Sequence, residues 1–116
     1  MAAKANIIID QGTDFSTTLT IRDTAGAILN LTDYTAAAQL RKHYTSQTAT
    51  NFTIEFESPR SAGQLTIKLD RLLTANLEAG RYVYDLEITD TSANTKSRLI
   101  EGIATVTPQV TFTEGV

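Results

Sequence analysis

The sequence contains no cysteine, and this absence excludes several classes of function. Disulfide frameworks, thiolate metal sites and cysteine nucleophiles are ruled out. A chain without cysteine suits a reducing cytoplasm, or a particle that is assembled there. The chain also lacks an apolar run near the roughly 20 residues that span a bilayer, and residues 1–6 lack the apolar core of a signal peptide. We therefore expect a protein that is soluble and intracellular at synthesis, with no membrane partner.

Basic charge is also scarce. The formal net charge is −3, whereas surfaces that bind nucleic acid usually carry an excess of Lys and Arg. The strongest basic cluster is short: Arg41, Lys42 and His43, followed by Tyr44. A solvated loop explains this cluster better than a nucleic-acid site does, so we expect no nucleic-acid partner.

Threonine, by contrast, is abundant, with 20 of 116 positions. Its β-branched side chain favours strands and turn edges over helix interiors. The length suits one domain that buries roughly 60–70% of its unfolded surface. Composition thus favours a single all-β domain.

The clearest element lies in residues 77–90, where a turn at Gly80 is followed by strict alternation. One face carries Tyr82, Tyr84, Leu86 and Ile88, and the other carries Val83, Asp85, Glu87 and Thr89. A period of two predicts a strand with one buried face. We expect it to be the central strand of the sheet, with both tyrosines in the core and both carboxylates on the solvated face.

Six further segments also resemble strands, and turn signals separate them. They are residues 7–9, 15–22, 34–41, 52–57, 65–70 and 99–106. For residues 34–41 a helix is a competing interpretation, because Ala, Gln, Leu, Arg and Lys favour helices. The Asp23-Thr24-Ala25-Gly26 segment predicts a hairpin turn, and residues 52–70 predict a second hairpin. Residues 71–77 predict one helical turn that plugs an end of the domain, and Gly102 suggests a β-bulge.

Together these elements predict a single antiparallel β-sandwich of immunoglobulin-like architecture, with about seven strands and one short helical turn. The sandwich is expected over residues 5–108. Residues 1–4 and 109–116 are possible extended arms, because Pro108 ends the ladder. A frayed tail is the alternative interpretation of the C-terminal segment.

No catalytic constellation is visible in the sequence. The single histidine, His43, lies in a loop-like segment, and no Gly-x-Ser-x-Gly elbow is present to position a nucleophile. Asp85 and Glu87 belong to the predicted polar face, where a solvent-facing salt bridge explains them better than acid–base catalysis. We expect a protein that is not an enzyme, with no catalytic residues, no metal site and no cofactor.

Two segments are candidates for contacts with other subunits. The first is the C-terminal arm, in which Val110 and Phe112 alternate with threonines and can add a strand to a neighbour. The second is the long polar loop of residues 43–51, with His43 and Tyr44 at its start. Tyr44 is also the best candidate for stacking on a sugar if the protein is instead a glycan-binding module.

A series of motifs carries a family resemblance over residues 7–111. It includes Gly12-Thr13-Asp14-Phe15, Asn30-Leu31-Thr32-Asp33-Tyr34-Thr35, Gly63-Gln64-Leu65-Thr66-Ile67, the segment of residues 77–86, and Glu101-Gly102-Ile103-Ala104-Thr105-Val106-Thr107-Pro108. The series resembles small β-sandwich structural proteins of tailed bacteriophages, and is similar to the N-terminal module of phage baseplate upper proteins.

The resemblance implies a virion structural protein, made in the host cytoplasm. Its expected partners are other phage structural proteins, with several copies in the particle or a homo-oligomer. Head decoration and a place in the tail or baseplate both stay open, and the resemblance implies no catalytic residues.

Overall fold

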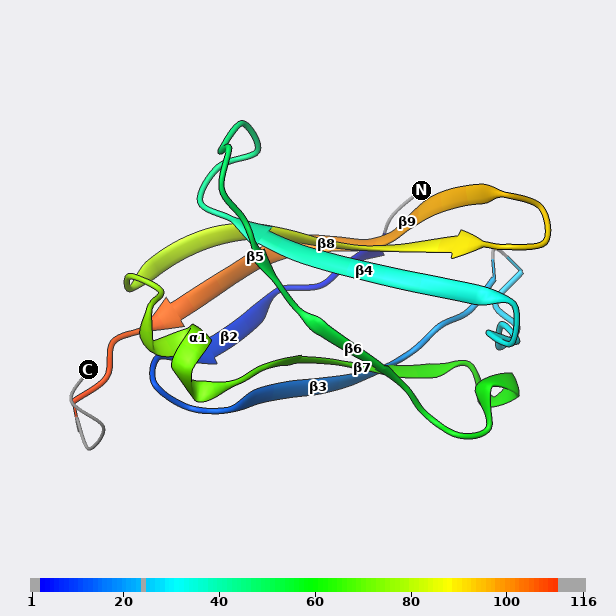
Figure 1. Cartoon of the computed structure of the whole chain (residues 1–116), viewed down its shortest axis with the longest axis horizontal. Helices are drawn as coiled ribbons and strands as arrows, with labels where there is room; N and C mark the ends of the chain where they lie inside the picture. Colours follow the sequence, from blue (N-terminus) through cyan, green and yellow to red (C-terminus); the bar gives the residue numbers. More distant parts are fainter. Residues whose placement is uncertain (1–2, 24, 111–116) are drawn as a thin grey trace.

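The computed structural model describes residues 3–23 and 25–110, which form two β-sheets packed face to face (Figure 1). The larger sheet contains β1 (Ala3–Lys4), β2 (Ile7–Asp10), β4 (Tyr34–Arg41), β5 (Thr50–Asn51), β8 (Gly80–Asp90) and β9 (Thr95–Thr107). The smaller sheet contains β3 (Phe15–Thr20), β6 (Thr53–Phe56) and β7 (Gln64–Leu69). A 3₁₀ turn, η1 (Arg60–Ala62), and a short helix, α1 (Arg71–Ala75), complete the described chain. The predicted all-β sandwich is confirmed.

The strand predicted from residues 77–90 is indeed central. β8 pairs with β4 on one side and β9 on the other, both antiparallel. Its apolar face points into the sandwich, where Tyr82, Tyr84, Leu86 and Ile88 are all buried. The outward residues are only half-buried, because neighbouring side chains on β4 and β9 flank them.

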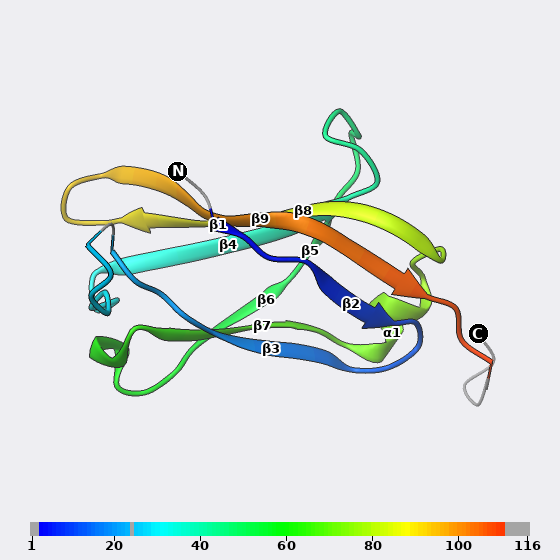
Figure 2. The same ribbon diagram turned by 180° about the vertical axis from the view of Figure 1, so that it is seen from behind.

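One detail of the predicted sheet is wrong, because it is not wholly antiparallel. β1 and β2 both run parallel to β9, along the edge that β8 leaves free (Figure 2). A parallel pair needs a long crossover connection, and here almost the whole domain separates β2 from β9. Ala3 and Lys4, which the sequence placed in a possible N-terminal arm, pair with Ile100 and Glu101. Residues 1–2 lie outside the described residues.

A single residue marks the place where the chain passes from one sheet to the other. β5 pairs with β4 in the larger sheet, and β6, only one residue later, pairs with β7 in the smaller sheet. The residue between them is Phe52, whose ring is buried in contact with Phe15 and Tyr84 at centroid distances of 6.2 and 6.1 Å. Figure 1 shows β5 and β6 as one diagonal segment that links the two layers.

Local turn chemistry follows the sequence at the first hairpin. The Asp23 carboxylate accepts hydrogen bonds from the amides of Ala25 and Ala27, and Gly26 adopts φ +88°. The predicted 52–70 hairpin is also confirmed by the antiparallel pairing of β6 with β7. Residues 34–41 form a strand, not a helix, because Ala38 and Leu40 face the core at strand spacing.

The bulge in β9 lies at Leu99 and not at Gly102. Leu86 pairs with Ile100 and Glu87 pairs with Arg98, so Leu99 is the extra residue. Gly102 is in register with Tyr84, and a side chain there would collide with the carbonyl group of Ala5. The missing side chain of Gly102 therefore allows the N-terminal backbone to approach β9 closely. Close approach of another backbone is the other common reason for glycine in a strand.

The helical turn predicted at residues 71–77 is present as α1 at one end of the sandwich. Asp70 caps it by accepting a hydrogen bond from the amide of Leu73 at 2.9 Å. Its leucines do not fill the core, since Leu72 and Leu73 are 55% and 39% exposed. The fully buried helix residue is Thr74.

Candidate docking surfaces

The loop that begins with His43 and Tyr44 projects from the larger sheet, between β4 and β5 (Figure 1). Both residues are exposed, and Tyr44 is exposed to 76%. The base of the loop is ordered by Arg41, whose guanidinium donates to the carbonyl of Ser46 at 2.6 Å and to Gln39 at 3.0 Å. The loop therefore presents Tyr44 from a fixed base.

Beneath this loop, the outer face of the larger sheet carries a row of polar side chains. The register aligns Asn51, Gln39, Asp85, Glu101 and Lys4 across five strands. Gln39 donates to Asn51 at 2.7 Å, and Lys4 lies 4.0 Å from Glu101. Sequence alternation placed Asp85 on this face, but only the strand order shows which residues flank it.

Asp85 is the central residue of this row. Its partial burial raises its pKa, the nearby charges of Glu87 and Glu101 raise it further, and Arg98 opposes the shift. The Arg98 guanidinium lies 3.2 Å from the Asp85 carboxylate. The predicted surface salt bridge is therefore present.

A hollow of about 280 Å³ lies between Tyr44 and this polar face. Its lining residues include Gln39, Arg41, Asp85 and Arg98. An exposed aromatic ring beside several hydrogen-bonding groups is suited to a polar, hydroxyl-rich ligand. The arrangement contains no visible nucleophile–base pair.

The C-terminal candidate segment leaves the sandwich at the end that carries α1 (Figures 1 and 2). β9 stops at Thr107, immediately before Pro108, as predicted. Gln109 is still attached, because its amide donates to Gln11 at 2.9 Å and Gln11 in turn donates to the carbonyl of Leu77 at 2.8 Å. Val110 is 91% exposed.

Three large apolar side chains are exposed at this end of the sandwich, among charged residues such as Asp70 and Arg71. They are Val110, Leu72 and Leu73, and we call this end of the molecule the α1 end. Phe112, the other residue predicted for contacts in the C-terminal arm, lies outside the described residues. The structure therefore separates the two predicted contact sites, with Tyr44 on the loop and Val110 at the α1 end.

Sequence reasoning missed a groove of about 630 Å³ at the opposite end, beside the β8–β9 turn. We call it the β9 groove. Its apolar lining includes Ile21, Leu29, Tyr34, Ile88, Leu99 and Ile100. These residues come from four separate parts of the chain, so no local pattern in the sequence identifies them as one surface.

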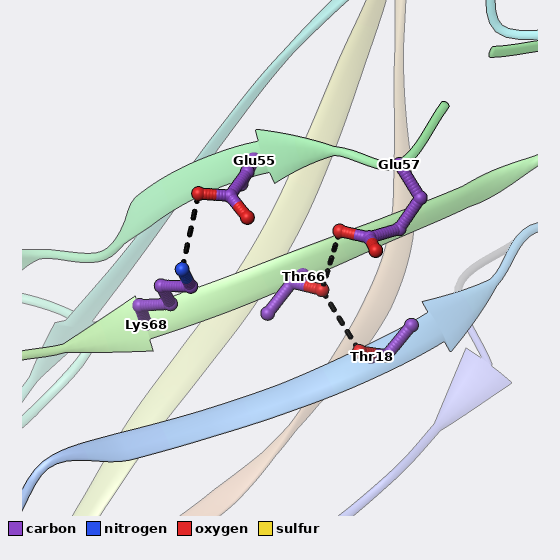
Figure 3. Close-up of polar contacts among 5 residues, drawn as sticks. All are labelled: Thr18, Glu55, Glu57, Thr66 and Lys68. Atoms are coloured by element: carbon purple, nitrogen blue, oxygen red, sulfur yellow. Dashed lines mark hydrogen bonds and ion pairs between the residues drawn. The ribbon is translucent and has the colours of Figure 1, made fainter. Parts of the chain in front are cut away.

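The outer face of the smaller sheet is polar and internally paired (Figure 3). Thr66 bonds to Thr18 at 2.8 Å and to Glu57 at 3.1 Å, and Lys68 lies 3.0 Å from Glu55. These side chains satisfy one another across β3, β7 and β6. On this solvated face these five side chains are therefore already paired with one another.

Over residues 3–23 and 25–110, no group of three or more His, Asp or Glu side chains is placed to hold a metal ion. No helix in the same ranges is long and apolar enough to cross a membrane.

No family model matches the sequence, and no curated protein matches it. Among solved structures, the chain is similar to InlP of Listeria monocytogenes, with a TM-score of 0.49 and 9% identity over 91% of this chain. The chain spans 28% of the length of that protein. A similarity this weak carries no argument about function.

Proposed function

We propose that this protein is a non-enzymatic structural component of a tailed-phage virion that docks on other virion subunits. The phage assignment comes from the resemblance carried by the motifs of residues 7–111. The docking role is supported by one structural observation, the exposed apolar side chains of Val110, Leu72 and Leu73 at the α1 end. There the chain leaves the sandwich with Val110 exposed to 91%, after Gln109 has been fixed to the Gln11 side chain.

Physical considerations favour docking through this end. The two sheets pack on one shared core, which gives the docking segment a fixed point of attachment. An extended segment can add a strand to an exposed sheet edge on a neighbour. Main-chain hydrogen bonds then supply affinity, while alternate side chains supply specificity. Head decoration and a tail or baseplate position are both compatible with such docking.

The test is incorporation into particles. One set of virions is assembled with the chain that lacks residues 110–116, and another with the full chain. Quantitative mass spectrometry should find far fewer copies of the truncated chain per virion than of the full chain. A Thr111→Ala, Thr113→Ala variant is the control, because it keeps both apolar residues. Equal incorporation of the truncated chain would contradict docking through this segment. Absence of the full chain from purified virions would contradict the virion assignment itself.

A second candidate function is glycan binding, which the hollow beneath Tyr44 favours. Here Tyr44 supplies the ring for stacking, and Gln39, Arg41 and Asp85 supply hydrogen bonds to hydroxyl groups. A glycan array with the intact protein would identify a ligand. Tyr44→Ala should then abolish binding, whereas His43→Ala, next to it in the same loop, should preserve it. If the array detects no saccharide, this candidate function is wrong.

A further inference from the structure

The two ends of the molecule have complementary surfaces. The α1 end carries exposed apolar side chains, and the opposite end carries the apolar β9 groove. The molecule is elongated, with a longest dimension of 45 Å, and Figures 1 and 2 both place α1 and the β8–β9 turn at its two extremes. One end of a copy can therefore meet the other end of the next copy.

The β9 groove also borders an unpaired strand edge. β1 and β2 cover the edge of β9 only from Ile100 to Thr107. Within the described part of the chain, no strand pairs with that same edge between Thr95 and Leu99. Unpaired backbone groups beside an apolar groove form a receptor for an added strand.

The C-terminal segment has the pattern that such a receptor requires. In the sequence Val110-Thr111-Phe112-Thr113, apolar residues alternate with threonines. If this segment is extended, Val110 and Phe112 fall on one face and the threonines on the other. The apolar face can then pack into the groove, while the threonine face points to solvent.

The segment cannot reach the groove of its own molecule. The near end of the receptor, Leu99, lies eight residues before Thr107, or about 26 Å along β9. Val110 and Phe112 follow Thr107 by three and five residues, which gives reaches of about 10 and 17 Å. The edge in between is already occupied by β1 and β2. The receptor must therefore belong to a different copy.

We propose that the segment beginning at Val110 binds a second copy as an added strand along Thr95–Leu99, with Val110 and Phe112 in the β9 groove. This inference rests on the proposed docking function and specifies its partner, a second copy of this chain. The contact is head-to-tail, because each copy contributes its C-terminal segment to one neighbour and its β9 groove to another. Such contacts produce rings or filaments and not closed two-fold dimers.

The test uses two variants that each remove one side of the contact. Val110→Glu with Phe112→Glu damages the donor segment, and Leu99→Asp damages the receptor groove. Full-length wild type should self-associate with concentration in analytical ultracentrifugation, and each variant alone should be monomeric. An equimolar mixture of the two variants should form a heterodimer and stop there, because it contains one intact donor and one intact receptor.

The matched control for the donor is Thr111→Glu with Thr113→Glu. It adds the same charge to the same segment but on the solvent face, and it should associate as the wild type does. If Leu99→Asp fails to fold by circular dichroism, Ser97→Pro replaces it, because proline removes an N–H from the strand.

A direct readout locates the site. A peptide of residues 108–116, added to the chain that ends at Gln109, should shift the amide resonances of residues 95–100, and the Glu-substituted peptide should bind at least about tenfold more weakly. A wild type that stays monomeric, a mixture that does not pair, or shifts elsewhere would overturn the inference. A monomeric wild type that still enters virions would leave the proposed function standing.

Discussion

At the scale of single residues, Thr74 connects two parts of the α1 end, the helix and the turn between β2 and β3. Its hydroxyl group accepts from the amide of Gly12 at 3.0 Å and donates to the carbonyl of Thr13 at 2.7 Å. The side chain is fully buried, so water cannot replace either bond. The turn that leads from β2 to β3 is thereby fixed to the helix.

Thr74→Val should therefore destabilise the protein by about 1–3 kcal/mol, because it removes both hydrogen bonds of the buried hydroxyl group, each of which contributes about 0.5–1.5 kcal/mol. Urea unfolding followed by circular dichroism measures the change. Thr74→Ser keeps the hydroxyl group and should recover most of the loss. If the Val variant keeps its stability while the Ser variant loses it, packing of the methyl group matters and the hydrogen bonds do not.

Asp85 should give the protein a specific dependence on pH. Burial raises its pKa in the folded state above the ordinary value of 3.8, with Glu87 adding to the shift. The folded state therefore holds this proton to a higher pH than the unfolded state does. The contribution of Asp85 to the free energy of unfolding should fall as pH rises from below 3.8 through the folded-state pKa.

Denaturant unfolding at a series of pH values, combined with NMR titration of Asp85, measures this effect. Asp85→Asn cannot titrate, so its unfolding free energy should lack this decline. An Asp85 resonance that titrates below 3.8 would contradict the prediction.

At the scale of elements, the N-terminal strand depends on one glycine of β9. Gly102 lies directly beneath the Ala5 carbonyl, and the same carbonyl accepts a hydrogen bond from the Tyr84 hydroxyl at 2.5 Å. The amide of Ala5 donates to Glu101 at 3.0 Å. The junction between β1 and β2 is therefore held from three directions.

Gly102→Ala should displace this junction at a cost of about 1–3 kcal/mol, because the added methyl group overlaps the backbone. Tyr84→Phe should cost about 1 kcal/mol by removing the hydrogen bond. Because both changes act on Ala5, the double variant should lose less than their sum. Faster hydrogen exchange at the Ala5 amide would identify the site, and unchanged exchange in both variants would contradict the argument.

At the scale of the whole molecule, the fold closes at Gln109, and the proposed docking segment begins after it. Removing residues 110–116 should change the free energy of unfolding by less than about 0.5 kcal/mol, because Val110 is almost fully exposed. The same truncation should abolish self-association. Thermal unfolding and ultracentrifugation of one sample measure both properties. A large loss of stability would show that the segment belongs to the sandwich.

The sequence alone determined the properties that depend on neighbours along the chain. Alternation in β8 predicted which side chains are buried, and Asp23 with Gly26 predicted a turn, because both follow from local backbone geometry. Pro108 predicted the end of β9, because proline lacks the N–H that a ladder needs.

The properties that depend on distant segments follow only from the three-dimensional arrangement of the chain. The parallel pairing of β1 and β2 with β9, and the role of Gly102 beneath Ala5, join residues almost a whole chain apart. The β9 groove is assembled from four separate segments. Because Val110 lies too far from this groove to enter it in the same molecule, the proposed C-terminal occupant comes from another copy. Strand order and strand length set these relations, and neither one is contained in the local pattern of residues.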